Sequence, residues 1–218
     1  MRYILIVLYL AISISLKAQS KFKTGLVYQF GASTLYGGHS NMNDATNYSP
    51  SYFIKISNGI GIKSQYLVFN NFIFNLQAVY QQKGASFDKN IYSYTPKFSF
   101  NYLDLRFGLS YRTNALLKTS RLEFGVNGIY SRLLSATRVN YLESFNIIND
   151  SQPNDFGVSL NGGLIIPRLD CDEFQIKVFA NSGFTNTFSG VLNENGLVGK
   201  NLIFGIQLGY LFGKRNNK

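Results

Sequence analysis

The chain has little of what many functional sites require, since its 218 residues include one cysteine, one histidine and no tryptophan. A single cysteine cannot form an intrachain disulfide, and Cys171 with His39 alone cannot build a zinc site. The neighbouring carboxylates of Asp170 and Asp172 disfavour a thiolate by like-charge repulsion. We therefore interpret Cys171 as an unreactive turn residue and assign no cofactor and no catalytic residue.

Acidic residues are also few, and their spacing fits no metal site. No run of them matches the ligand spacing of a dedicated calcium loop. The acidic residues considered are Asp44, Asp150, Asp155, Asp170 and Asp172. The sequence therefore predicts no metal ion.

Long apolar runs are absent except near the N-terminus, over residues 3–16. Arg2 supplies a positive charge before this run, and Ala18 supplies the small residue that signal peptidase requires. The run is shorter than the roughly 20 residues of a spanning helix. We therefore predict a signal peptide over residues 1–18, cleaved after Ala18, and one domain over residues 19–218. A helical membrane protein is excluded, because no later run is long enough.

The net charge of +10 falls to +8 once Arg2 and Lys17 leave with the signal peptide. The basic residues are scattered along the chain, whereas a nucleic-acid surface needs them clustered on one face. An exported protein also rarely meets such a partner. We predict no nucleic-acid partner, and expect lipopolysaccharide phosphates of the outer membrane as the anionic neighbours.

What the chain does have is eight segments in which large apolar residues alternate with small or polar ones. In the last segment, Leu202, Phe204 and Ile206 alternate with Ile203 and Gly205. Such a period of two predicts strands that face an apolar medium on one side. The expected strands are 24–36, 51–66, 72–83, 98–112, 122–130, 156–166, 174–181 and 202–212.

Long and short connections alternate between these strands. The long ones are 37–50, 84–97, 136–154 and 187–200, and they follow the first, third, fifth and seventh strands. This is typical of an up-and-down barrel with long extracellular loops and short periplasmic turns. We therefore predict an all-β, eight-stranded antiparallel transmembrane barrel, a monomer with both termini on the periplasmic side.

Three Asn-Gly pairs could instead mark hairpins, since this dipeptide is a strong turn signal. A hairpin at Asn58-Gly59 would break the run of outward isoleucines, so we read that strand straight through. The pairs at 127–128 and 161–162 are read in the same way by analogy.

Three segments resemble a known family. The segment 76–84, Leu76-Gln77-Ala78 onward, is similar to the third-strand signature of the PorT-like outer-membrane barrels common in Bacteroidota. The segment 102–109 resembles that family's fourth strand, with Arg106 where proline is usual. The segment 155–164 resembles a later strand of the family. The resemblance implies an eight-stranded outer-membrane barrel of mostly unassigned function.

Two alternative functions remain open on the sequence. A lipid-modifying enzyme would rest on His39 in the first long loop, beside Ser40, with Ser86 and Asp88 as conceivable partners. A small pore would rest on inward charges. These are Lys55, Asp104, Arg106, Glu123 and Lys177. An eight-stranded barrel is just wide enough for its side chains to fill, so we expect these charges to pair and plug the lumen.

A soluble barrel that holds a ligand is a further alternative fold. It needs an apolar lumen, whereas the inward residues are expected to be Gly, Ser, Asn, Gln and Lys. We therefore expect a non-catalytic membrane barrel that acts through its extracellular loops. The loop at 136–154 is the longest expected loop, and its Tyr141, Phe145, Ile147 and Ile148 could form a surface for a protein partner.

Overall fold

The computed structural model describes residues 21–37, 52–87, 97–114, 120–140, 143–168, 171–189 and 198–213. Ten strands and one short 3-10 helix occur in these residues. They are β1 (Phe22–Tyr36), β2 (Tyr52–Phe53), β3 (Lys55–Phe69), β4 (Phe72–Phe87), β5 (Lys97–Arg112), β6 (Arg121–Asn140), β7 (Glu143–Asn146), η1 (Ile148–Asp150), β8 (Asn154–Pro167), β9 (Glu173–Gly183) and β10 (Lys200–Gly213). No helix among the described residues has the length and apolar character needed to cross a membrane.

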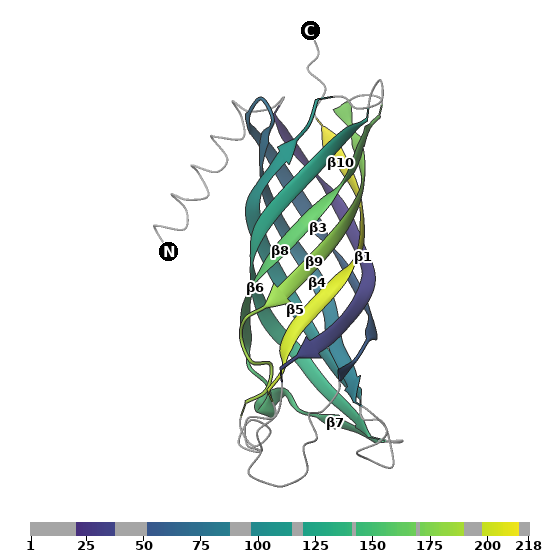
Figure 1. Cartoon of the computed structure of the whole chain (residues 1–218), viewed down its shortest axis with the longest axis vertical. Coiled ribbons are helices and arrows are strands. Elements are labelled where there is room, and N and C mark those ends of the chain that lie inside the picture. Colours follow the sequence, from purple (N-terminus) through teal and green to yellow (C-terminus); the bar gives the residue numbers. More distant parts are fainter. Residues whose placement is uncertain are drawn as a thin grey trace, which may run out of the picture.

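Eight of the strands form one closed antiparallel barrel (Figure 1). Each long strand pairs with the next long strand along the chain, and β1 closes the ring by pairing with β10 from Lys23↔Gly213 to Tyr36↔Lys200. Closure removes every free edge of the main sheet, so the backbone groups of the wall are paired without water. The predicted eight-stranded up-and-down barrel is confirmed.

The two ends of the barrel differ, as the alternation of loop lengths predicted. At one end, here called the turn end, β1 begins, β10 ends and short connections join β3 to β4, β5 to β6, and β8 to β9. At the other end, here called the loop end, lie the four long connections, the short strands β2 and β7, and η1 (Figure 1). Both described ends of the chain therefore lie at the turn end.

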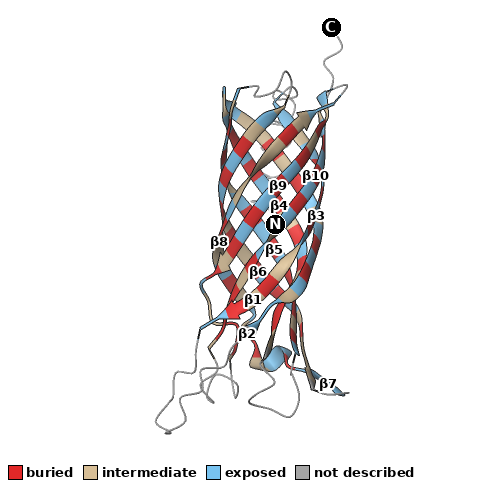
Figure 2. Cartoon of the chain, turned by 45° about the vertical axis from the view of Figure 1, so that its right-hand side comes forward, coloured by how far each residue is buried: buried red, intermediate tan, exposed pale blue. Residues whose placement is uncertain are grey.

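The alternation of side chains follows the predicted phase in the barrel wall (Figure 2). Outward Leu26, Leu160 and Val178 are 59%, 54% and 64% exposed, whereas inward Asp104 and Arg106 are 0% and 2% exposed. The strands run straight through all three Asn-Gly pairs, at 58–59, 127–128 and 161–162. The outward, apolar face is thus continuous around the barrel.

The strand that closes the ring needs glycine where two backbones approach each other. Gly31 on β1 lies opposite Gly205 on β10. A Cβ on Gly31 would lie 2.2 Å from the carbonyl oxygen of Phe204, and one on Gly205 would lie 2.3 Å from that of Phe30. Real Cβ atoms do not approach backbone oxygens so closely, so both positions require glycine.

Several predicted loop boundaries were wrong at the loop end. β4 continues to Phe87, and so takes in the first residues of the loop expected at 84–97. β6 continues to Asn140 and pairs with β7, so the loop expected at 136–154 contains a hairpin and η1 instead of irregular chain alone. Pairing with β5 stabilises the extra residues of β6, because Thr137 to Val139 lie opposite Lys97 to Ser99.

Candidate functional site: the barrel lumen

The lumen is filled by polar and charged side chains over most of its length. Every second side chain of each strand points into the lumen. Because an eight-stranded barrel is narrow, inward side chains of opposite charge from different strands meet there. Among the described residues, the inward charges that form ion pairs fall into two groups, here called the turn-end network and the central triad. An apolar cluster follows the central triad toward the loop end.

The turn-end network is organised around two buried glutamates. Arg112 on β5 donates two hydrogen bonds to Glu123 on β6, at 2.7 and 3.1 Å, and lies 2.7 Å from Glu173 on β9. Lys177 forms an ion pair with Glu123, and Lys23 lies 2.6 Å from Glu173. Both glutamates are less than 5% exposed, so these pairs are removed from water and each lost partner would leave a buried charge.

One lysine of the turn-end network lacks a carboxylate partner within salt-bridge distance among the described residues. Lys63 on β3 is 1% exposed, and its ammonium donates to the amide oxygen of Gln175 at 2.9 Å. Gln175 in turn donates to Gln65, which donates to Glu123. Positive charge therefore exceeds negative charge in this part of the lumen.

The central triad consists of Asp104, Arg106 and Lys83. Asp104 on β5 lies 2.9 Å from Arg106 and 2.9 Å from Lys83, which comes from the neighbouring strand β4. Arg106 also donates to Gln29 on β1, across the lumen, and Gln29 donates to Gln207 on β10. The triad thus connects strands that share no backbone ladder.

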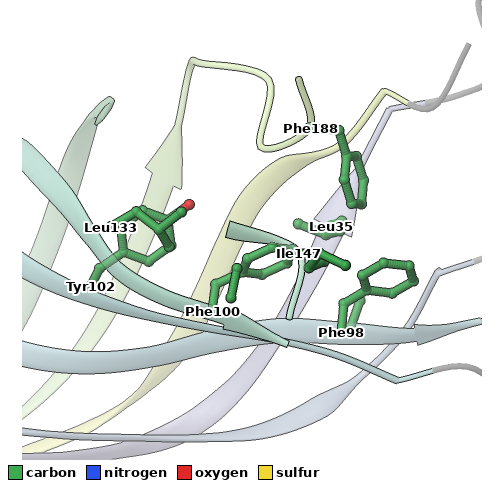
Figure 3. Close-up of a cluster of buried hydrophobic side chains, with 9 residues drawn as sticks. Leu35, Phe98, Phe100, Tyr102, Leu133, Ile147 and Phe188 are labelled. Carbon is green, nitrogen blue, oxygen red and sulfur yellow. The ribbon is translucent and has the colours of Figure 1, made fainter. Parts of the chain in front are cut away.

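The loop end of the lumen is apolar, which the sequence reading missed. Nine buried residues, here called the apolar cap, pack together there (Figure 3). They are Leu35, Ala85, Phe98, Phe100, Tyr102, Leu133, Ala136, Ile147 and Phe188. The expectation of a polar inner face is therefore correct for the turn end and the centre of the lumen and wrong for the loop end.

Aromatic rings form the centre of the apolar cap. The ring of Phe188, which follows β9, lies edge-on to Phe98 and Phe100 with centroid distances of 5.4 and 6.0 Å. Ile147 is only 7% exposed, and its amide donates to the carbonyl of Ala136. The expectation that Ile147 lies on an exposed tip was therefore wrong, because this side chain turns inward to cover the lumen.

Two other apolar residues of the loop expected at 136–154 are exposed, unlike Ile147. Phe145 and Ile148 are 44% and 37% exposed, as the reading of a partner surface requires. Tyr141 lies outside the described residues. The apolar surface offered by this loop is therefore smaller than the sequence suggested.

Four of the five predicted inward charges pair as expected. Asp104, Arg106, Glu123 and Lys177 all make ion pairs inside the barrel. Lys55 does not, because it lies beside the apolar cap and donates instead to the carbonyl oxygen of Phe98 at 3.3 Å. The contributions of Lys23, Lys83 and Glu173 were missed, although all three share the inward parity of their strands.

The residues proposed for catalysis are not brought together by the described part of the structure. His39, Ser40 and Asp88 lie outside the described residues, and Ser86 lies on β4 opposite Lys97 of β5. Asp44 and Asp170 also lie outside them. Among the described residues, no group of three or more His, Cys, Asp or Glu side chains could hold a metal ion. Cys171 is exposed in the turn that follows β8, as expected.

The geometry defines a class of protein: a closed, eight-stranded antiparallel barrel with an apolar outer face and a filled lumen. No family model and no curated protein matches the sequence.

Among solved structures, the chain is similar to Neisserial surface protein A, with a TM-score of 0.50 and 10% identity over 88% of this chain and 96% of that one. It is also similar to OprG from Pseudomonas aeruginosa, with a TM-score of 0.49 and 12% identity over 89% of this chain and 99% of that one. For Ail of Yersinia pestis the TM-score is 0.44 and the identity 13%, over 88% of this chain and 99% of that one. The likeness to Neisserial surface protein A, at 10% identity, shows that the chain shares its barrel fold.

Proposed function

We propose that this protein is a monomeric, integral outer-membrane barrel that acts without catalysis, as a structural or interaction protein. Its turn end faces the periplasm and its loop end faces the cell surface. The filled lumen carries this proposal, because it leaves the loops and the rims as the working surfaces. Loops held by a rigid scaffold are where binding residues most often lie.

The outer face supports insertion into a bilayer. Each of the eight long strands carries outward-facing large apolar side chains that are between 36% and 70% exposed. A soluble monomer rarely exposes a contiguous apolar patch larger than a few hundred Å², whereas this surface encircles the barrel. The charged side chains at outward positions of the described barrel strands are Lys97, Arg132 and Lys200, all close to the loop end. A bilayer accommodates such a distribution, with the charges near the surface.

Aromatic pairs at the turn end are consistent with the same placement. Phe72 and Tyr111 lie edge to face with their centroids 5.4 Å apart, and Tyr210 and Phe212 are 5.0 Å apart. Aromatic side chains are enriched at both interfaces of membrane barrels. These pairs would mark the periplasmic interface.

Two successive barriers argue against a conducting pore. The central triad links β4, β5 and β1 across the lumen, and the apolar cap closes the lumen at the loop end. An ion passing through would have to break buried ion pairs and then cross an apolar layer, and both steps are costly. The pairing also argues against a soluble carrier barrel, which needs an open apolar cavity.

Fractionation and reconstitution test the proposal together. The full chain should be recovered in the outer-membrane fraction as a band whose electrophoretic mobility changes on heating, and it should give no stable conductance steps in planar bilayers. The Phe100→Ala variant, which removes a ring from the apolar cap, is measured in the same bilayers as a control for whether the assay detects an opened lumen. Recovery from the periplasm without detergent would overturn the membrane placement, and stable steps from the unaltered protein would overturn the plug.

The lipid-modifying alternative is tested in the same preparation. Lipid A from cells that express the full chain should have the same mass as lipid A from cells that express the His39→Ala variant. A change in mass that requires His39 would overturn the non-catalytic proposal.

A further inference from the structure

The turn end of the barrel contains a cavity of about 400 Å³, which opens toward the side that carries the short connections. It lies at the mouth of the lumen, and several residues of the turn-end network form part of its wall. Residues from β1, β3, β4, β5, β6 and β9 line it. Its lining includes Lys21, Lys23, Gln65, Arg112, Arg121 and Glu173. Its volume falls in the range of small-molecule sites, about 300–1,000 Å³.

The lining of this turn-end cavity carries excess positive charge. Four of its residues are cations and one is a carboxylate, Glu173, which already contacts Lys23 at 2.6 Å and Arg112 at 2.7 Å. Lys21 and Arg121 are exposed to the cavity, and neither makes an ion pair with another described residue. Two cationic groups at the mouth therefore have no ionic partner within the described part of the chain.

The floor of the cavity is also cation-rich. Deeper in the lumen, Lys63, Arg112 and Lys177 surround Glu123, and Lys63 has no carboxylate within salt-bridge distance in the described structure. These groups are buried in a narrow lumen, where the effective dielectric constant is low and charges are poorly screened. A field of one sign focused in such a recess attracts anions.

We propose that the turn-end cavity binds a small ligand that carries a phosphate group. A phosphate brings up to two negative charges and several acceptor oxygens, which suits ammonium and guanidinium donors arranged around one point. Lys21 and Arg121 would hold the phosphoryl oxygens at the mouth, and the side-chain amide of Gln65 lies on the wall. The cavity is larger than a bare phosphate, so the rest of a phosphorylated headgroup or a free phosphorylated compound would also fit.

Titration calorimetry of the full chain in non-ionic detergent tests this proposal. The probes are inorganic phosphate, glycerol phosphate and short-chain phosphatidylglycerol, each at ionic strength matched with sodium chloride. We expect binding of all probes that carry phosphate. Tighter binding of phosphatidylglycerol identifies a lipid headgroup as the source, and tighter binding of glycerol phosphate identifies a soluble compound. Saturable binding of none of them would overturn the proposal.

Matched variants separate this site from general charge attraction. Lys21→Gln with Arg121→Gln removes two cations at the turn end, and Lys97→Gln with Arg132→Gln removes two at the loop end. All four side chains are at the barrel rims, and each protein should keep its heat-modifiable band. We expect the turn-end pair to weaken phosphate binding by at least tenfold, as a lost charge-assisted hydrogen bond does.

The loop-end pair should change phosphate binding by less than twofold. Equal weakening by both pairs would show attraction to net charge alone and would overturn the site. Equal affinity for acetate at the same ionic strength would overturn the assignment to phosphate.

Discussion

Glu123 is the residue on which the turn-end network depends most, and its replacement gives the sharpest test of the lumen. The side chain is 0% exposed, and its carboxylate accepts from Lys177, from Arg112 at 2.7 Å and from Gln65 at 3.0 Å. Glutamine has nearly the same shape, so Glu123→Gln removes the charge without leaving a cavity. The change therefore isolates the electrostatic contribution.

The expected cost follows from the partners that remain. Arg112 keeps Glu173, whereas Lys177 has no other carboxylate within salt-bridge distance among the described residues. Breaking a buried pair by removing one partner typically costs about 3–5 kcal/mol, because the other charge stays buried and uncompensated. Glu123→Gln combined with Lys177→Gln should recover part of that loss, since it removes the stranded charge as well.

The free energy of unfolding can be measured by urea titration in detergent micelles. Far-UV circular dichroism is the suitable signal, because the chain contains no tryptophan. Glu143→Gln on β7 is the matched control: its side chain is exposed, and the change should stay within about 0.5 kcal/mol. If both variants lose the same stability, water screens the lumen and the reasoning from buried charge is refuted.

Three further changes can be measured by urea titration, the first in lipid bilayers and the other two in detergent micelles. Leu160→Arg on the outward face should cost about 2–4 kcal/mol in lipid, and Leu134→Arg near the loop end about 0–1 kcal/mol; equal costs would place the bilayer elsewhere on the barrel. Gly205→Ala should cost about 1–3 kcal/mol, because the new methyl group meets the backbone of β1; an unchanged urea midpoint would contradict the close approach. Phe100→Ala in the apolar cap should cost about 3–5 kcal/mol, whereas exposed Phe145→Ala should cost little, and similar small losses would show that the cap is loosely packed.

Much of the barrel could be predicted because the period of two is a local property of each strand. The inward phase of Asp104 and Arg106, and the outward phase of Leu105, follow directly from alternation along β5. The same parity places Phe98 and Phe100 inside, so the apolar cap was within reach of the sequence. It was missed because the inner face was judged from the middle of the strands.

The rest could not be read from alternation. On β6 the pairing with β5 shifts by one residue, since Asn101 lies opposite Ser135 but Tyr102 lies opposite Leu133. This bulge reverses the phase, so Ala136 points inward where simple parity places Ser135. A bulge depends on how two strands pair, which the sequence of one strand does not encode by itself.

The choice of ionic partners was equally beyond the sequence. Arg106 reaches Gln29, which is far away along the chain and across the lumen, and Arg112 reaches Glu173 on a strand that is not its neighbour. Such contacts depend on the relative heights of all eight strands, which the closure of the ring determines. Alternation shows which charges point inward but does not show which of them meet.

The apolar cap at the loop end of the lumen also holds two of the long connections in place. Ile147 and Phe188 come from two different connections at the loop end, and both are buried in the apolar cap beside β5. An antiparallel bridge between Ser151 and Phe188 then joins these two connections directly. A loop tied to the barrel by buried side chains loses less conformational entropy when it binds a partner than a free loop does. Under the proposed interaction role, the same packing that blocks the lumen would also hold part of the loop end rigid for binding.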